Sequence, residues 1–489
     1  MKHHILWITL ALGMTCGIAH AEATSTDIDQ ALKIAQARQE PVFVDFSAIW
    51  CHSCHAMDDK VLNGAEWNAR QDRFVLVRSD ADSANGSAWM KKLTVPALPT
   101  YVVLNPDGSE RGRLTGEFTR AKFYPALDRL LSGADAMPKL KTDAMHGSPD
   151  AVAKVLGTYD DRDQQQAGLR WYAGLPASAR KAVEANPLAA TRLAVIEAHA
   201  KMKATIEAGR HDELEAMLRK ETNSAKRQKI RDAIAKLPPP LPASQRTALA
   251  QDCRTHALKA LRGPLELDEH FDMAGTLLEC AAALPKPQQK ALATAQLPAL
   301  KALYDTKVAA AGSGALREAT YTLADYYKVL GDGAGEKAVY QRTIAIGRKM
   351  LGDGHGGFDV KRDQSMAEVF DEFLDRHGTP DEKSEDLALQ KAMVQAYPDN
   401  AFYQTAYGGS LLKQGHAAEA LPYLQHGADN ASAQDKLGYT RSLAKALIAL
   451  NRRPEAEKLF NAALRAAEKQ FPQDTKMEMA YWKQSGAVL

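Results

Sequence analysis

The chain has 489 residues, which is too long for a single hydrophobic core and predicts two to four domains. Apolar residues make up 45% and charged residues 25%, and the formal net charge is +2. This balance is ordinary for a globular protein, and it lacks the one-sided charge that would attract nucleic acid or an anionic lipid surface. We therefore expect no nucleic-acid partner.

The N-terminus has the pattern of a secretory signal peptide. Lys2 supplies a positive charge, residues 5–14 form an apolar run, and Ala19 and Ala21 place small residues two apart. The run has about half of the ~20 residues that a membrane-spanning helix needs, so a cleavable leader (residues 1–21) is favoured over the alternative, an N-terminal anchor. Export from a bacterial cell would lead to the periplasm, where disulfides persist.

Residues 22–131 have the pattern of a small α/β domain. Short runs of β-branched and aromatic residues predict buried strands, with helical stretches between them. These runs lie at 42–46, 74–77 and 101–104; a turn signal at 105–108 then predicts a returning strand at 111–114, and helices are expected at 28–38, from 51 onward, around 87–92 and over 118–131. This alternation predicts an α/β sandwich.

The rest of the chain is predicted to be all-α. Residues 132–149 show no period and are interpreted as a linker, at the end of which Ser148 and Pro149 start a helix as N-cap and first helical residue. A helical pattern rich in alanine and leucine then continues nearly to the C-terminus. The proline-rich stretch 237–242 interrupts it and is expected to be a stiff spacer.

The C-terminal part repeats itself. Small and large residues recur 36 positions apart: Gly408, Leu411 and Leu424 correspond to Ala444, Leu447 and Phe460. Stacked helical hairpins need small residues where paired helices touch, and the pattern resembles tetratricopeptide repeats, whose usual period is 34 residues. We assign residues 310–489 to these repeats and residues 150–309 to a separate helical domain.

The chemistry of the chain centres on Cys51 and Cys54. They follow a predicted buried strand and open a helix, so Cys51 would lie at the helix N-terminus, where free N–H groups and the helix dipole stabilise an anion. An exposed Cys51 thiolate could attack a client disulfide, and Cys54, one turn later, could resolve the mixed disulfide. His52, Ser53 and His55 surround the pair, and both histidines would lower the pKa of Cys51 when protonated.

Two further positions support this interpretation. Asp45 points inward from the preceding strand, so its pKa should be raised and it could take the proton of Cys54; a buried carboxylate without a catalytic role is the alternative. Pro99 stands at the start of the 101–104 strand, where a cis peptide would expose backbone groups that pair with an extended substrate. With Leu98 and Trp50 it forms the predicted docking surface.

These motifs, from Val44-Asp45-Phe46 through Trp50-Cys51-x-x-Cys54 to Leu98-Pro99-Thr100, resemble thioredoxins, most of all the C-terminal thioredoxin-like domain of the disulfide reductase DsbD. The resemblance implies a thioredoxin fold, with Cys51 as nucleophile, Cys54 as resolving thiol, Asp45 as proton acceptor and Pro99 as the cis-proline. The chain departs from the thioredoxin pattern in three places: His52-Ser53 replaces Gly-Pro, Ser47 replaces a Trp and His55 replaces a Lys. The direction of the redox reaction therefore stays open.

The Cys51-x-x-Cys54 motif is also compatible with roles other than redox chemistry. Cys51-x-x-Cys54-His55 also has the spacing of covalent c-type haem attachment, and a non-redox structural disulfide fits as well. A zinc site would need a second ligand pair at matching spacing, which the motif lacks. We expect no metal and no cofactor besides the cysteine pair.

The remaining two mature cysteines lie in predicted helices on either side of a turn at residues 262–264. In an antiparallel hairpin Cys253 and Cys280 would fall near the same level, so we hypothesise a structural disulfide, with two buried free thiols as the alternative.

The sequence thus predicts an exported thiol–disulfide oxidoreductase, a protein-disulfide reductase or isomerase. Its partners would be protein thiols and disulfides, a membrane-embedded electron donor, and a protein or peptide bound by the helical repeats. The alternative is a periplasmic scaffold in which the repeats act and the thioredoxin-like domain is regulatory or inactive.

Overall fold

The computed structural model describes residues 26–220, 224–235, 240–432 and 435–470, with 475–476, 479 and 482–483. The predicted signal peptide lies outside the described residues, as does the first half, residues 237–239, of the predicted proline-rich spacer. Within the described ranges, no helix combines the length and the apolar character needed to cross a bilayer.

The first domain contains a four-stranded mixed sheet. The strands are β1 (Val42–Ser47), β2 (Val75–Asp80), β3 (Thr100–Leu104) and β4 (Glu110–Thr115). Their order is β2-β1-β3-β4, with β1 parallel to β2 and antiparallel to β3, and β3 antiparallel to β4. The first three were predicted from the runs of β-branched and aromatic residues, and β4 was predicted as the strand that returns after the turn at residues 105–108.

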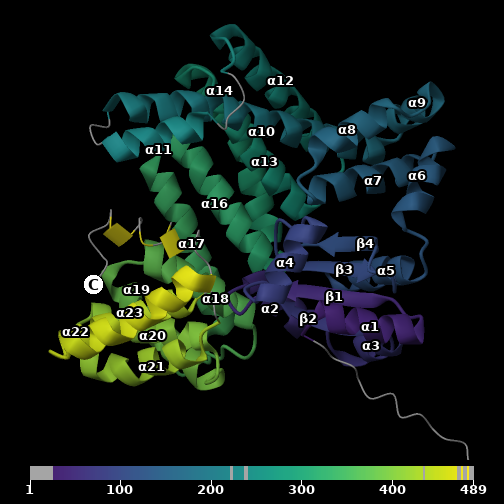
Figure 1. The fold of residues 1–489 in the computed structure, drawn as a ribbon. Coiled ribbons are helices and arrows are strands. Elements are labelled where there is room, and N and C mark those ends of the chain that lie inside the picture. Colours follow the sequence, from purple (N-terminus) through teal and green to yellow (C-terminus); the bar gives the residue numbers. More distant parts are fainter. Residues whose placement is uncertain are drawn as a thin grey trace, which may run out of the picture.

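Helices cover both faces of this sheet (Figure 1). They are α1 (Ile28–Arg38), α2 (His52–Lys60), α3 (Gly64–Asn68), the short 3₁₀ turn η1 (Gln71–Arg73), α4 (Ala84–Leu93) and α5 (Arg120–Leu131). Alternate residues of β1 face opposite cores: Val44 packs with α1 and α4, whereas Phe43 packs with α2, α3 and α5. Asp45 shares the Phe43 face and so points toward α2.

The rest of the described chain is nearly all helical. The helices are α6 (Met137–Met145), α7 (Pro149–Asp161), α8 (Gln165–Ala173), α9 (Ala177–Ala185), α10 (Pro187–Lys220), α11 (Ser224–Ile234), α12 (Ala243–Leu261), α13 (Leu267–Ala281), α14 (Lys286–Leu303), the π-helical η2 (Tyr304–Val308), α15 (Ala309–Ala311), α16 (Ser313–Leu330), α17 (Gly333–Leu351), α18 (Gln364–His377), α19 (Pro380–Ala396), α20 (Ala401–Lys413), α21 (Ala417–Asn430), α22 (Lys436–Ala449) and α23 (Arg453–Gln470). The predicted fold class, a thioredoxin fold followed by an all-α part, is confirmed.

The prediction of a linker over residues 132–149 is wrong. This stretch contains α6, whose Leu140 and Ala144 are buried in one apolar cluster with α7. The N-cap and first-turn assignment is confirmed, because the Ser148 side chain accepts from the N–H of Ala151 and Pro149 is the first residue of α7. The α/β domain therefore continues into the helical part without an extended spacer.

The hypothesised second disulfide is present. Cys253 of α12 and Cys280 of α13 are bonded, with their Cα atoms 5.5 Å apart, and neither side chain is exposed to solvent. The bond links the two arms of a helical hairpin.

The C-terminal helices pack as consecutive hairpins with small residues at their contacts. A Cβ atom on Gly408 would lie 2.7 Å from the Cγ of Leu424, and one on Gly427 would lie 2.1 Å from the Oγ1 of Thr405. These two glycines therefore allow α20 and α21 to approach closely.

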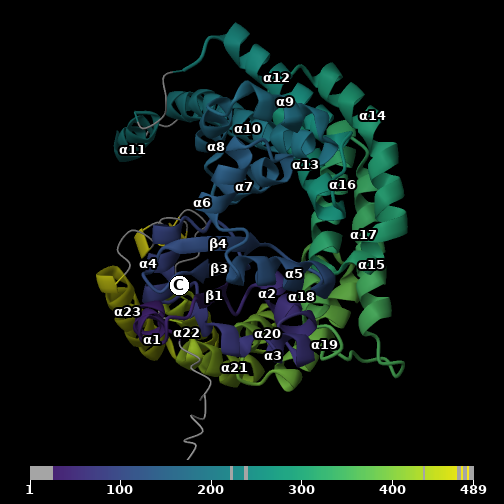
Figure 2. The same ribbon diagram turned by 90° about the vertical axis from the view of Figure 1, so that its right-hand side faces the viewer.

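The helical part leaves the α/β domain at α6 and curves back to it (Figure 2). On its return, α16 and α18 pack directly against α2, the helix that carries the cysteine motif. An ion pair between Lys122 of α5 and Glu266 beside α13, 2.8 Å long, also joins the two parts. The cysteine motif consequently lies between the α/β domain and the helices.

Candidate active site

Cys51 and Cys54 lie at the start of α2. Cys51 is the N-cap residue, and its Sγ atom accepts from the backbone N–H of Cys54 at 3.2 Å. The two cysteines are joined by a disulfide, with Cα atoms 5.2 Å apart. Opening this disulfide would leave the Cys51 sulfur at a helix N-terminus, where backbone N–H groups and the helix dipole favour a thiolate.

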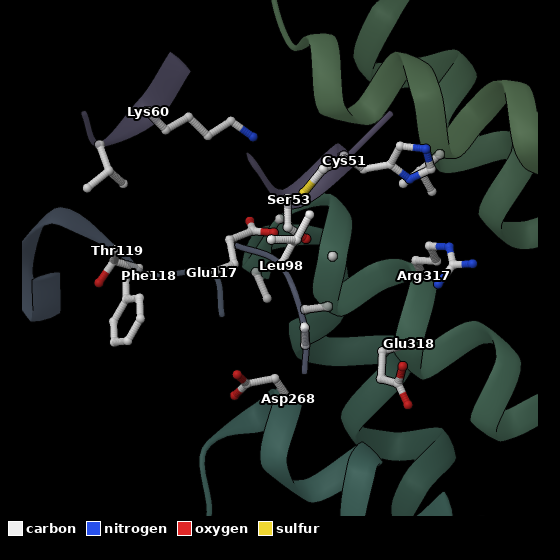
Figure 3. Close-up of a pocket in the computed structure, with 18 of the residues that line it drawn as sticks. Cys51, Ser53, Lys60, Leu98, Glu117, Phe118, Thr119, Asp268, Arg317 and Glu318 are labelled. Atoms are coloured by element: carbon white, nitrogen blue, oxygen red, sulfur yellow. The ribbon is translucent and has the colours of Figure 1, made fainter. Parts of the chain in front are cut away.

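The cysteine pair is more enclosed than the sequence indicated. We expected an exposed Cys51, but its relative exposure is 6%, and that of Cys54 is 2%. Cys51 instead lines a cavity of about 1500 Å³, which we call the main cavity. The α/β domain forms one wall, and the helical part forms the other, chiefly through α13, α15 and α16; Figure 3 shows Phe118 on one side of the cavity and Arg317 and Glu318 on the other.

Asp45 lies buried in the sheet behind the cysteine motif, with 3% of its surface exposed. Burial, reinforced by the negative charge of Asp58, raises the pKa of Asp45 to about 7, although Arg78 opposes the shift. The nearest Arg78 nitrogen is 3.7 Å from an Asp45 carboxylate oxygen. The prediction of an inward-facing carboxyl with a raised pKa is confirmed, and such a group exchanges protons readily near neutral pH.

Two of the three predicted docking residues, Trp50 and Leu98, line the main cavity, and the third, Pro99, does not. Trp50 is 42% exposed, and its indole N–H donates to Asp82 at 2.6 Å, which fixes the ring beside Cys51. Leu98 lines the cavity, and the Leu98–Pro99 peptide bond is cis. Pro99 itself is buried and its carbonyl accepts from the N–H of Gly116, so Leu98 is the residue of this turn that faces the cavity.

The pKa values of the two histidines of the motif shift in opposite directions, a difference that the sequence did not indicate. Burial lowers the pKa of His52, so the neutral ring is favoured. Burial also opposes protonation of His55, but a hydrogen bond and the negative charge of Glu368 outweigh it and raise the pKa of His55. Of the two histidines, His55 is therefore the one whose protonated form the surroundings favour.

Glu368 is a site residue that the sequence did not indicate. It comes from α18, and its Oε1 atom lies 2.7 Å from Nδ1 of His55, with side-chain exposures of 1% and 14%. Tyr403 donates a hydrogen bond to the same oxygen, and Gln364 donates to the Tyr403 hydroxyl at 2.6 Å. A single sequence gives no signal that would bring residues 55 and 368 together.

Ser53 marks a second contact between the motif and the helical part. Ser53 makes a hydrogen bond with Glu117, whose pKa is raised mainly by burial. A Cβ atom on Gly314, in the first turn of α16, would lie 2.5 Å from a Glu117 carboxylate oxygen and 3.2 Å from the Ser53 hydroxyl. Glycine at this position lets α16 approach the motif closely.

Among the described residues, no group of three or more His, Cys, Asp or Glu side chains is arranged to hold a metal ion.

The mixed sheet between two helical layers, with a Cys-x-x-Cys pair at the start of the helix after β1, defines a domain of the thioredoxin fold with a redox-type cysteine pair. A thioredoxin-like family model matches residues 22–106. The thiol:disulfide interchange protein TxlA of Synechococcus elongatus is 30% identical over 146 residues, which cover 29% of this chain and 71% of that relative. The chain belongs to the thioredoxin-like family.

Other relatives match the same N-terminal fraction. The thiol:disulfide interchange protein DsbD of Cronobacter sakazakii is 38% identical over 113 residues, 22% of this chain and 19% of the relative. DsbD of Ralstonia nicotianae is 31% identical over 116 residues, 23% of this chain and 19% of the relative. The chain thus spans about a fifth of the length of these DsbD relatives. The solution structure of a thioredoxin from Thermus thermophilus matches 22% of this chain and 88% of that chain, with 30% sequence identity and a TM-score of 0.21.

Proposed function

We propose that this protein is an exported thiol–disulfide oxidoreductase that reduces or isomerises disulfides in client proteins. The observation that carries the proposal is the bonded pair of Cys51, at the N-terminus of α2, and Cys54, one turn later, with the buried carboxyl of Asp45 on the sheet below. Family membership and the names of the relatives, thiol:disulfide interchange proteins, support it.

In the proposed reductive cycle the reduced Cys51 thiolate attacks one sulfur of a client disulfide. The client bond breaks, a mixed disulfide with Cys51 forms, and the other client sulfur leaves as a thiolate that takes up a proton. Asp45 then accepts the proton of Cys54, whose thiolate attacks the Cys51 sulfur and releases the second client thiol. The protein ends with the Cys51–Cys54 disulfide seen in the structure. Two electrons from a thiol donor restore the dithiol.

Trp50, Leu98 and Pro99 are the proposed docking surface for the client. Trp50 and Leu98 support this role because they line the main cavity together with Cys51, and Pro99 holds the turn that presents Leu98 through a cis peptide bond. The cavity lies between two parts of the protein and Cys51 is only 6% exposed. An extended or unfolded segment would therefore fit this site better than the flat surface of a folded protein.

The cellular setting is part of the proposal. The N-terminal signal-peptide pattern supports periplasmic location, and a membrane-embedded dithiol is the proposed electron donor. The helical part would bind clients or partners, and its contacts with α2 support a direct role at the redox site. The scaffold alternative, in which the thioredoxin-like domain does no chemistry, predicts that the protein lacks reductase activity.

The test is reduction of insulin by dithiothreitol with the full-length protein. Wild type should accelerate the reaction, and Cys51→Ser should abolish the acceleration, because nothing else can form the mixed disulfide. Equal rates for the two proteins would overturn the redox assignment and favour the scaffold. In addition, Cys54→Ser should accumulate mixed disulfides with clients, whereas the double variant Cys51→Ser with Cys54→Ser should not.

A further inference from the structure

A second, smaller cavity of about 330 Å³ adjoins the main cavity; we call it the side cavity. The two cavities share His52 and Arg317 in their walls, so the side cavity begins one residue from Cys51 along the chain. Its other walls come from α18, α19 and α20 of the helical part. It is therefore absent from an isolated thioredoxin domain and exists only because the helices return to α2.

The side cavity presents hydrogen-bond acceptors that have no donor. Glu368 is 2% exposed and Gln390 is 6% exposed, and both line the cavity. The Oε2 atom of Glu368 and the Oε1 atom of Gln390 are buried without a hydrogen-bond partner. No buried donor of the described lining residues is left unpartnered. Since an unmet buried acceptor is costly, the cavity is suited to a ligand that brings donors.

The basic residues in the walls do not meet this need, because they are already paired elsewhere. Arg317 lies 2.6 Å from Glu372, and Lys413 lies 3.7 Å from Asp375. Arg376 also pairs with Glu372, at 3.6 Å. The carboxylate of Glu368 is engaged through Oε1 alone, by His55 and Tyr403.

The remaining walls fit the stem of a long cationic side chain. Met393 and Phe402 provide apolar surface, and the Tyr403 ring lies beside Glu368. Lysine and arginine place a methylene stem on apolar surface and a head that carries only donors, three or five N–H groups, among acceptors. An ion-assisted hydrogen bond to a carboxylate is about twice as strong as a neutral one, so a cation is preferred to a neutral amide.

We propose that the side cavity binds a lysine or arginine side chain of the client polypeptide, within about three residues of the client's reacting cysteine, and so selects clients with a basic residue there. The inference rests on the proposed function. The spacing follows from geometry: an extended chain advances about 3.3 Å per residue, and the cavity starts at the residue next to Cys51. The helical part would thereby act as a specificity element for the thioredoxin-like domain.

The experiment uses reduced full-length protein and short peptides whose single cysteine is bonded to a chromophoric thiol, so that attack by Cys51 releases colour. Lysine is placed at each of the three positions on either side of the cysteine and compared with norleucine, which has a similar stem without the charge. At the favoured position we expect the second-order rate constant of colour release to be about tenfold higher for lysine, as one charge-assisted hydrogen bond would give.

Two variants assign the preference to the side cavity. Glu368→Gln replaces an acceptor by an amide, and Ala406→Leu fills the cavity without touching the ion pair at His55. Both should reduce the lysine-to-norleucine ratio to near one. The ratio is informative even if the thiol changes, because both peptides react with the same Cys51. Ala418→Leu, on the exposed face of α21, is the matched control and should keep the preference.

The outcomes distinguish failure of the side-cavity proposal from failure of the proposed oxidoreductase function. Equal rates for lysine and norleucine peptides at every position would overturn the side-cavity assignment and leave the oxidoreductase intact. A lysine preference that survives both variants would overturn it too. If neither peptide reacts with wild type, the proposed function itself fails.

Discussion

The disulfides of Cys51–Cys54 and Cys253–Cys280 lie in contrasting surroundings. The first joins residues three positions apart at the N-terminus of α2, and Cys51 lines the main cavity. The second joins α12 and α13 across 27 positions, and neither cysteine is exposed at all. A thiolate can attack only a sulfur that it can reach, and the Cys51 sulfur lines a cavity. Cys51 also lies at the N-terminus of a helix, which stabilises its sulfur as a thiolate when the disulfide opens. The surroundings therefore separate a redox bond from a structural one.

The strongest test of this contrast is selective reduction. At a low concentration of dithiothreitol under native conditions, the Cys51–Cys54 disulfide should be reduced at least about 1000-fold faster than the Cys253–Cys280 disulfide. The Cys253–Cys280 bond is buried and becomes accessible only when the α12–α13 hairpin opens. The measurement is timed alkylation followed by mass spectrometry of the cysteine-containing peptides. Denaturant should abolish the difference, and comparable native rates would contradict the contrast.

Removing the buried disulfide should change stability and not activity. Replacing Cys253 and Cys280 by alanine should lower the free energy of unfolding by about 3 to 4 kcal/mol, the range expected for a closed loop of this length. The insulin-reduction rate should stay within about twofold of wild type under conditions where the variant is folded. Urea unfolding and the reductase assay, done on the same preparation, measure both. A folded but inactive variant would show that α12 and α13 contribute to the redox site.

Asp45→Asn should slow release of the client from the mixed disulfide by about 100-fold, the usual scale for a lost general base. Because the pKa of Asp45 is raised to about 7, the rate of mixed-disulfide resolution in the wild type should decrease at pH values below about 7, where the carboxyl is protonated. The variant should lack this pH dependence. The raised pKa also means that wild type loses stability as the pH rises through about 7. Quenched-flow trapping of the mixed disulfide at several pH values gives the rate.

Asp58→Asn is the matched control for the pH profile. Asp58 raises the pKa of Asp45 and pairs with Arg78 at 2.6 Å. Its removal should lower the pKa of Asp45 and move the midpoint of the profile to lower pH, with Asp45 still active. If neither substitution changes the pH dependence of the resolution rate, Asp45 is excluded as the proton acceptor.

Local pattern was enough to predict most of the α/β domain. Alternation placed Asp45 inside the sheet, and the Cys-x-x-Cys spacing placed Cys51 at a helix start, since both features depend on residues near in sequence. The pattern failed at α6, a nine-residue helix that buries only Leu140 and Ala144, too few residues to show a period.

Contacts distant in sequence could not be predicted in this way. The enclosure of Cys51 and the opposite tendencies of His52 and His55 arise from α16 and α18, more than 250 positions downstream. Without those helices both histidines would be solvated and similar. The sequence therefore indicated the cysteine pair, Asp45 and the two histidines, but it gave no sign of Glu368 or of the burial that shifts the histidine pKa values.

Glu368→Gln is the smallest effect that we expect, and it tests whether the helical part tunes the redox site. Without the carboxylate, burial should dominate and the pKa of His55 should fall, since only the charges of Asp58 and Asp59 still favour the cation. A neutral His55, four residues after Cys51 on α2, no longer stabilises the thiolate. The Cys51 pKa should therefore rise by about half a unit, which means about threefold less thiolate near neutral pH.

The pH dependence of stability gives an independent readout of the same pair. A raised His55 pKa stabilises the folded wild type at pH values below the ordinary pKa of histidine, and this stabilisation is lost as the pH rises through the folded value. Glu368→Gln should therefore cost more stability at about pH 5.5 than at about pH 9. Tyr403→Phe removes a hydrogen bond and no charge, so its cost should be independent of pH. Urea unfolding at the two pH values, with iodoacetamide rates for Cys51, measures both effects, and an unchanged thiol pKa would confine Glu368 to packing.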